Sequence, residues 1–174
     1  HAQALVRRAG SDLVPIDTDF TDSKLEDASE YVARQQPEFL RVGRRWDCLT
    51  GIRTDGRFLE AHLSVAQEFQ DELVEQKFHP AVLDVATACA VQILAAEHEK
   101  MGFWVPLEYG AVEIRGPLPA EMTCRVQLLS EAKQSRTASF DIALGEDSGP
   151  PAVIIRGLRL RSLDGIESLC RHTD

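Results

Sequence analysis

The segment from Pro80 to about Lys100 limits the possible folds of this chain more than any other stretch. Proline stands at its start, where a helix tolerates it, and Gly102 follows its end, where glycine commonly closes a helix. Its apolar side chains point in nearly every direction around a helix, so the sequence predicts a helix that is buried on most sides. One carboxylate, Asp84, lies among these apolar residues.

Strand patterns lie on both sides of this segment. Two strands are expected before it, at residues 45–53 and 56–65, because Asp55-Gly56 between them is a strong hairpin signal. Residues 24–36 have the spacing of a further helix, and residues 66–76 read as a short helical or irregular stretch.

Four β-branched, alternating segments follow the long helix and are expected to be strands. They lie at residues 107–116, 123–131, 135–145 and 151–162, with Gly157 suited to a β-bulge. In the second strand of the hairpin, His62 alternates with the polar residues, which favours a solvent-facing position. The order of elements predicts an α+β domain in which one long helix meets an antiparallel sheet.

Composition excludes several classes of function. The formal net charge is −9 and basic residues are scattered, which argues against a nucleic-acid partner. No apolar run is long enough to span a bilayer, and the start of the chain lacks the apolar core of a signal peptide. The cysteines Cys48, Cys89, Cys124 and Cys170 are widely spaced, so we expect reduced, mostly buried thiols in a cytoplasmic protein and no metal site.

Three segments, in order, carry a resemblance to a known family. Residues 78–92, FHPAVLDVATACAVQ, look like the His-Pro-x-x-Leu-Asp signature in the second half of polyketide synthase dehydratase domains. Residues 105–119, VPLEYGAVEIRGPLP, are similar to the segment that follows it there. Residues 38–52, EFLRVGRRWDCLTGI, stand in the place of that family's Gly-x-x-Tyr-Gly-Pro-x-Phe stretch.

The resemblance implies a hot-dog fold, in which a long central helix is wrapped by an antiparallel sheet. These dehydratases are double hot dogs, and the matched segments predict the C-terminal half. Residues 1–23 are then an arm or linker that could include the last strand of the preceding hot dog, residues 24–163 the hot dog itself, and residues 164–174 a tail. The catalytic His motif of the first half, His-x-x-x-Gly-x-x-x-x-Pro, does not occur in this sequence.

The resemblance also implies the site residues. Asp84 matches the catalytic aspartate. Residues expected to contact the acyl substrate or its entry lie around it and on the following strand, and they are His79, Pro80, Leu83, Ala88, Pro106, Leu107 and Tyr109. Among these, His79 is expected mainly to support the entry to the helix, while a core role for Leu107 and Tyr109 stays open.

Two departures from the family pattern bear on the reaction. Trp46 stands where Phe is usual, and the Tyr and Pro of that stretch are absent. The family usually carries Gln or His four residues after the aspartate, on the same helix face, and here that position is Ala88. The carboxylate of Asp84 must therefore find another partner, or the domain runs a variant reaction.

The chemistry expected of such a domain is loss of water from a 3-hydroxyacyl thioester. Hydroxide leaves poorly, so Asp84 would protonate the hydroxyl group while a His from the other half removes the α-proton. Apolar neighbours favour the protonated carboxyl and the helix N-terminus favours the ionised form. That N-terminus could also polarise the thioester carbonyl through free backbone N–H groups.

Alternatives remain open at this stage: an enoyl isomerase or cyclase on the same fold, a non-catalytic structural or carrier-docking half, or a stand-alone hot-dog thioesterase or hydratase. The expected partners are the N-terminal hot-dog half, an acyl carrier protein and a second copy within a synthase. No diffusible cofactor is expected, because the phosphopantetheine arm belongs to the carrier.

Overall fold

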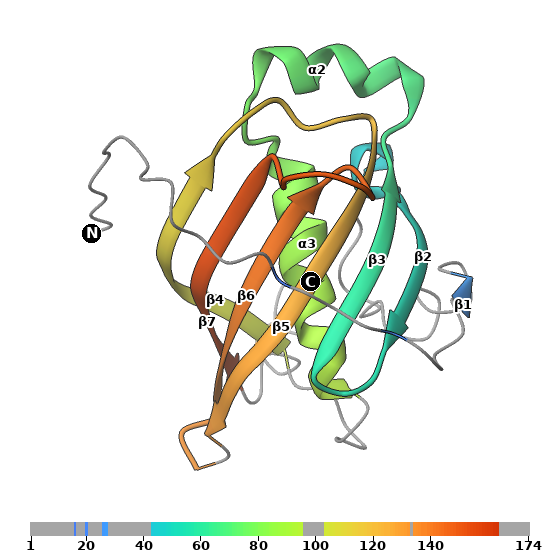
Figure 1. The fold of residues 1–174 in the computed structure, drawn as a ribbon. Coiled ribbons are helices and arrows are strands. Elements are labelled where there is room, and N and C mark those ends of the chain that lie inside the picture. The colour runs from blue at the N-terminus through green and yellow to red at the C-terminus, as the bar shows by residue number, and fades with distance from the viewer. Residues whose placement is uncertain are drawn as a thin grey trace, which may run out of the picture.

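An antiparallel sheet curves around one long helix, α3 (Pro80–Ala95), in the computed structural model (Figure 1). The structure describes Ile16, Phe20, Glu26–Asp27 and residues 43–95, 103–132 and 134–163. Short helical turns precede α3 in the chain: η1 (Arg44–Trp46), η2 (Gln67–Phe69) and α2 (Gln70–Glu75). The expected arrangement of one long helix and an antiparallel sheet is confirmed.

Among the described residues, the sheet has seven strands in the order β1-β2-β3-β5-β6-β7-β4, and all neighbours pair antiparallel. The two-residue β1 (Glu26–Asp27) and the twelve-residue β4 form its edges. The strands are β2 (Leu49–Thr54), β3 (Phe58–Ser64), β4 (Phe103–Ile114), β5 (Glu121–Ala132), β6 (Thr137–Gly145) and β7 (Val153–Leu163).

Strict alternation in β3 explains how the sheet covers the helix. Leu59, Ala61 and Leu63 are at most 1 % exposed and belong to one hydrophobic core with the buried residues of α3. Glu60 and His62 point to the opposite face, because successive side chains of a strand alternate across the sheet. The side chain of His62 is 41 % exposed, which agrees with the expected solvent-facing position.

The predicted hairpin is confirmed at Asp55-Gly56. The carboxylate of Asp55 accepts hydrogen bonds from the backbone N–H groups of Arg57 and Phe58, at 2.8 and 2.6 Å. Gly56 has a φ of +87°, a conformation that glycine adopts without the penalty of a side chain. Gly157 in β7 likewise has a φ of +60°, next to a register shift in the pairing with β6, as expected for a bulge.

Residues 24–36 were expected to form a helix, and this prediction is wrong where the structure describes them. Glu26 and Asp27 form β1, which pairs with Ile52 and Gly51 of β2. The backbone groups at the outer edge of β2 need hydrogen-bond partners, and this tertiary requirement outweighs a weak helical pattern. The first hairpin strand also begins later than expected, at Leu49, because η1 occupies residues 44–46.

Two other sequence-based assignments lie largely outside the described residues. Of the arm at residues 1–23, the structure describes only Ile16, which is buried, and Phe20. The expected tail at residues 164–174 is outside the described ranges altogether.

Candidate active site

Asp84 lies on an exposed stripe of α3. Pro80, Asp84 and Ala88 follow one another at four-residue spacing and are exposed, whereas Val82, Ala86 and Cys89 are buried against the sheet. The expectation that the carboxylate is buried is therefore wrong for this chain. The helix is apolar almost all round, but its exposed stripe faces away from its own sheet.

The carboxylate has a partner that the sequence analysis did not identify. The indole Nε1–H of Trp46 donates a hydrogen bond to Oδ2 of Asp84 at 2.7 Å, within the range of a strong charge-assisted bond. Ala88 has no side chain beyond Cβ with which to reach the carboxylate. Two departures from the family pattern could have indicated this bond: position 88 lacks the usual polar side chain, and position 46 has gained an N–H group.

The turn η1 that carries Trp46 is fixed by ion pairs. Arg44 pairs with Glu68 at 3.0 Å, and Arg45 donates to both oxygens of Glu72 at 2.7 to 3.0 Å. The guanidinium group of Arg45 also lies 4.6 Å from the centre of the Phe69 ring. A bidentate Arg–carboxylate pair imposes geometry as well as attraction, so η1 has a defined orientation relative to α2.

His79 is 1 % exposed and joins α2 to the start of α3. Its Nε2 lies 3.1 Å from Oε2 of Glu72, and its Nδ1 is buried without a hydrogen-bond partner among the described residues. Hydrogen bonds from Arg45, and then from His79, lower the pKa of Glu72 to about 2. This burial favours the supporting role expected for His79, and its contact with substrate stays a prediction.

The start of α3 was expected to polarise a thioester carbonyl through free backbone N–H groups, and this stays a prediction. The N–H of Leu83 donates to the carbonyl of His79 at 3.0 Å, so that amide is already used by the helix. Leu83 itself is half-buried and packs against the core.

The three candidates on β4 lie apart from this cluster. Pro106, Leu107 and Tyr109 are exposed, the last two by 50 % and 37 %. Within the described ranges, no hydrogen bond links any of them to Asp84. Their place along an acyl tunnel stays a prediction, since β4 pairs with β7 at the edge of the described part of the sheet.

Three cysteines are free and buried, as expected: Cys48, Cys89 and Cys124. Burial raises the pKa of Cys48 to about 12. A hydrogen bond with Cys89 and burial raise the pKa of Cys124 well above its ordinary value. Cys48 and Cys124 are therefore protonated at neutral pH, whereas the reactive form of cysteine is the thiolate.

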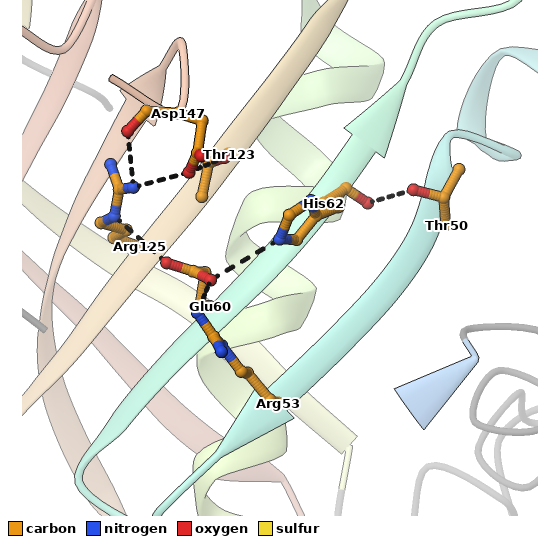
Figure 2. Close-up of polar contacts among 7 residues, drawn as sticks. All are labelled: Thr50, Arg53, Glu60, His62, Thr123, Arg125 and Asp147. Carbon is orange, nitrogen blue, oxygen red and sulfur yellow. Dashed lines mark hydrogen bonds and ion pairs between the residues drawn. The ribbon is translucent and has the colours of Figure 1, made fainter. Parts of the chain in front are cut away.

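A second polar cluster lies on the face of the sheet away from α3 (Figure 2). Glu60 is 4 % exposed and pairs with Arg53 of β2 and with Arg125 of β5, its direct neighbours across the sheet. Arg125 continues to Asp147 at 3.1 Å, and Arg53 lies 4.8 Å from the ring centre of Phe20. Each of these charged residues has an ion-pair partner, although Nε of Arg53 is buried without a hydrogen bond among the described residues. The cluster therefore braces neighbouring strands.

The described residues contain neither a metal-binding cluster nor a helix that could span a membrane. No group of three or more His, Cys, Asp or Glu side chains there could hold a metal ion. In the same part of the chain, no helix has the length and hydropathy required to cross a bilayer.

The geometry matches solved structures of one fold. The chain superimposes on GphF dehydratase 1 with a TM-score of 0.71 at 20 % identity, covering 84 % of this chain and 53 % of that one. It matches the dehydratase domain of RzxB from Pseudomonas fluorescens with a TM-score of 0.67 at 20 % identity, covering 84 % and 52 %. The fold is therefore the hot-dog fold, and this chain spans about half the length of these relatives.

A third match is the bifunctional dehydratase-cyclase domain in ambruticin biosynthesis, with a TM-score of 0.60 at 22 % identity over 70 % of this chain and 42 % of that one. The family described as "Polyketide synthase dehydratase N-terminal domain" matches residues 14–169, and the chain belongs to this family. A search of curated proteins found no match. The family description names an N-terminal domain, whereas the motifs predicted a C-terminal half, and the assignment to a half stays a prediction.

Proposed function

We propose that this chain is the C-terminal hot-dog half of a polyketide synthase dehydratase domain that acts in the cytoplasm. The domain converts 3-hydroxyacyl chains, tethered to the phosphopantetheine arm of an acyl carrier protein, into 2-enoyl thioesters. The observation that carries this proposal is the position of Asp84. Its carboxylate is exposed on the stripe of α3 that faces away from its own sheet, and one of its oxygens is held by Trp46.

Each half of the domain supplies one catalytic group to the proposed reaction. A His base from the other half takes the α-proton, and the electron pair of that C–H bond forms the double bond between the α and β carbons. Asp84 gives its proton to the β-hydroxyl, the C–O bond breaks, and water leaves. Asp84 can act as an acid only when its carboxyl group is protonated. An apolar enclosure favours the protonated form, and the other half of the domain would supply that enclosure.

The edge strand β4 supports the presence of a covering half. It carries four exposed apolar side chains, with exposed fractions of 37 to 50 %: Leu107, Tyr109, Val112 and Ile114. A long strand with exposed apolar side chains at the edge of a sheet is a site of association unless another segment covers it. The same surface would place Pro106 and Tyr109 beside the acyl chain once the other half is present.

The site around Asp84 also favours a second candidate, an enoyl isomerase or cyclase. Ala88 leaves space on the exposed stripe where the family usually has a larger polar side chain, and Trp46 replaces the usual Phe. Among the structural relatives are a bifunctional dehydratase-cyclase and an isomerase-inactive variant of the GphF dehydratase. Space beside the acid could admit a chain that moves its double bond or closes a ring.

Two experiments test the proposal. The complete domain is incubated separately with a 3-hydroxyacyl carrier and a 2-enoyl carrier, and the products are resolved by mass spectrometry and NMR. Loss of water from the first substrate, with no change in the second, supports the dehydratase. Migration of the double bond or ring closure supports the second candidate, and no conversion of either substrate supports a non-catalytic half.

The half assignment has its own test in the parent gene. The coding sequence before residue 1 is expected to contain His-x-x-x-Gly-x-x-x-x-Pro, which would supply the base. If the parent protein instead has that motif after residue 174, or nowhere, the assignment to the C-terminal half is wrong.

A further inference from the structure

Trp46 contributes one specific group to the site, the N–H of its indole ring. Tryptophan is half-buried here and its ring nitrogen can only donate a hydrogen bond, never accept one. The bond of 2.7 Å to Oδ2 of Asp84 therefore requires that oxygen to act as an acceptor.

This requirement distinguishes the two oxygens of the carboxyl group. When a carboxyl group is protonated, its carbonyl oxygen is the better acceptor and its other oxygen carries the proton. We infer that Trp46 is a positioning residue, which holds Oδ2 of Asp84 as the acceptor so that the transferable proton sits on Oδ1. This inference rests on the proposed function, in which that proton goes to the β-hydroxyl of the substrate.

The residues around Asp84 explain why its hydrogen-bond donor, Trp46, is distant in the sequence. Ala88, four residues after Asp84 on the same stripe, has no polar group, and no other hydrogen bond reaches the carboxylate within the described part of the chain. Trp46 approaches from η1, whose orientation is set by the ion pairs of Arg44 and Arg45. The helix backbone and the fixed N–H donor together restrict the Asp84 side chain to few rotamers, so the productive one is highly populated.

The test uses the complete domain with a 3-hydroxyacyl carrier as substrate. Trp46→Phe keeps an aromatic ring of similar shape and removes the N–H. We expect kcat to fall roughly 10- to 100-fold, the size of a lost hydrogen bond to a group that becomes charged as it gives up its proton, while KM changes less than about two-fold. Trp104→Phe, the same change at the other tryptophan of this chain, is the matched control and should retain the rate.

Rescue separates positioning from packing. In Trp46→Phe, a second change of Ala88→Gln places an amide donor one helical turn from Asp84, and we expect it to restore most of the lost rate. A merely structural role of Trp46 would not be repaired from position 88. Full activity of Trp46→Phe, or failure of this rescue in a folded double variant, overturns the inference.

Asp84→Asn distinguishes failure of the inference from failure of the proposed function. If Asp84→Asn is inactive and Trp46→Phe is fully active, the acid assignment stands and the positioning role is wrong. If Asp84→Asn is fully active, both are wrong.

A measurement that leaves Trp46 in place covers the case in which Trp46→Phe does not fold. The indole N–H signal of Trp46 in the ¹⁵N NMR spectrum should shift, and its exchange with solvent should accelerate, on Asp84→Ala. An unchanged signal would show that the hydrogen bond is absent in solution and would contradict the inference.

Discussion

Trp46 and Asp84, 38 residues apart in the sequence, are joined by a hydrogen bond of 2.7 Å between the indole nitrogen and a carboxylate oxygen. The bond links the turn η1 to the first part of α3, so the candidate acid depends on two elements rather than on its helix alone. The same turn is tied to α2 through Arg45 and Glu72. Loss of the Arg45–Glu72 pair should therefore change the geometry of the site.

Glu72 should contribute to stability in a pH-dependent way. Its pKa is lowered from 4.5 to about 2 by Arg45 and His79, so its contribution is fully present above about pH 4.5 and is lost as the pH falls towards 2. Glu72→Gln should lower the Tm at pH 7, and the difference from wild type should shrink between pH 5 and 3. Glu75→Gln, an exposed change on the same helix, is the control. A difference that stays constant over this range would contradict the prediction.

Glu60 should be a sensitive carboxylate on the outer face of the sheet, because it pairs with two arginines. Glu60→Gln leaves the guanidinium groups of Arg53 and Arg125 without their shared negative charge. Because both arginines are partly exposed, we expect a loss of about 2 kcal/mol, less than the ~3–5 kcal/mol of a fully buried pair. Glu121→Gln, at the exposed end of the same face, should cost less than about 0.5 kcal/mol. Equal effects of the two changes in urea unfolding would argue against the brace.

Gly110 should tolerate no side chain, because β4 and β7 approach closely there. A Cβ at this position would lie 2.9 Å from the carbonyl oxygen of Arg156, a backbone atom that cannot turn away. Gly110→Ala should cost about 1–3 kcal/mol in denaturant unfolding. Gly116→Ala meets nothing within 4 Å and provides the control for the general effect of replacing glycine. If both variants have the same stability, the close approach is not a constraint.

The buried thiols should be unreactive in the folded protein. The pKa of Cys48 is raised to about 12, so almost none of it is thiolate at pH 8. In a Cys170→Ser background, iodoacetamide should label none of the remaining thiols of this chain in the native state and all of them in denaturant. Rapid native labelling of Cys48, located by peptide mass spectrometry, would contradict the assigned burial.

The strands and the long helix could be predicted because their patterns are local. Alternation in β3 and the all-round apolar character of α3 are visible within a few residues of sequence. The prediction of a helix at residues 24–36 was wrong because Glu26 and Asp27 pair with the edge of β2. The local sequence pattern contains no information about that edge. Hydrophobic periodicity predicts which side chains are buried, but it does not predict backbone hydrogen bonds between segments that are distant in the sequence.

The candidate site was predicted in part. The position of Asp84 on the long helix follows from the sequence, and so does the absence of a polar residue at Ala88. The exposure of the carboxylate and its bond to Trp46 do not follow, because they depend on which stripe of α3 turns away from the sheet and on where η1 lies. Both are properties of the tertiary packing.

The most direct test of the central claim is the rate at which the complete domain dehydrates a 3-hydroxyacyl carrier when Asp84 is replaced by Asn. The amide oxygen can still accept the hydrogen bond from Trp46, so the fold should survive, but the amide cannot supply the proton. Asp71→Asn, an exposed change on α2, is the control and should keep the wild-type rate. We predict that Asp84→Asn forms no enoyl product, whereas undiminished turnover would contradict the account.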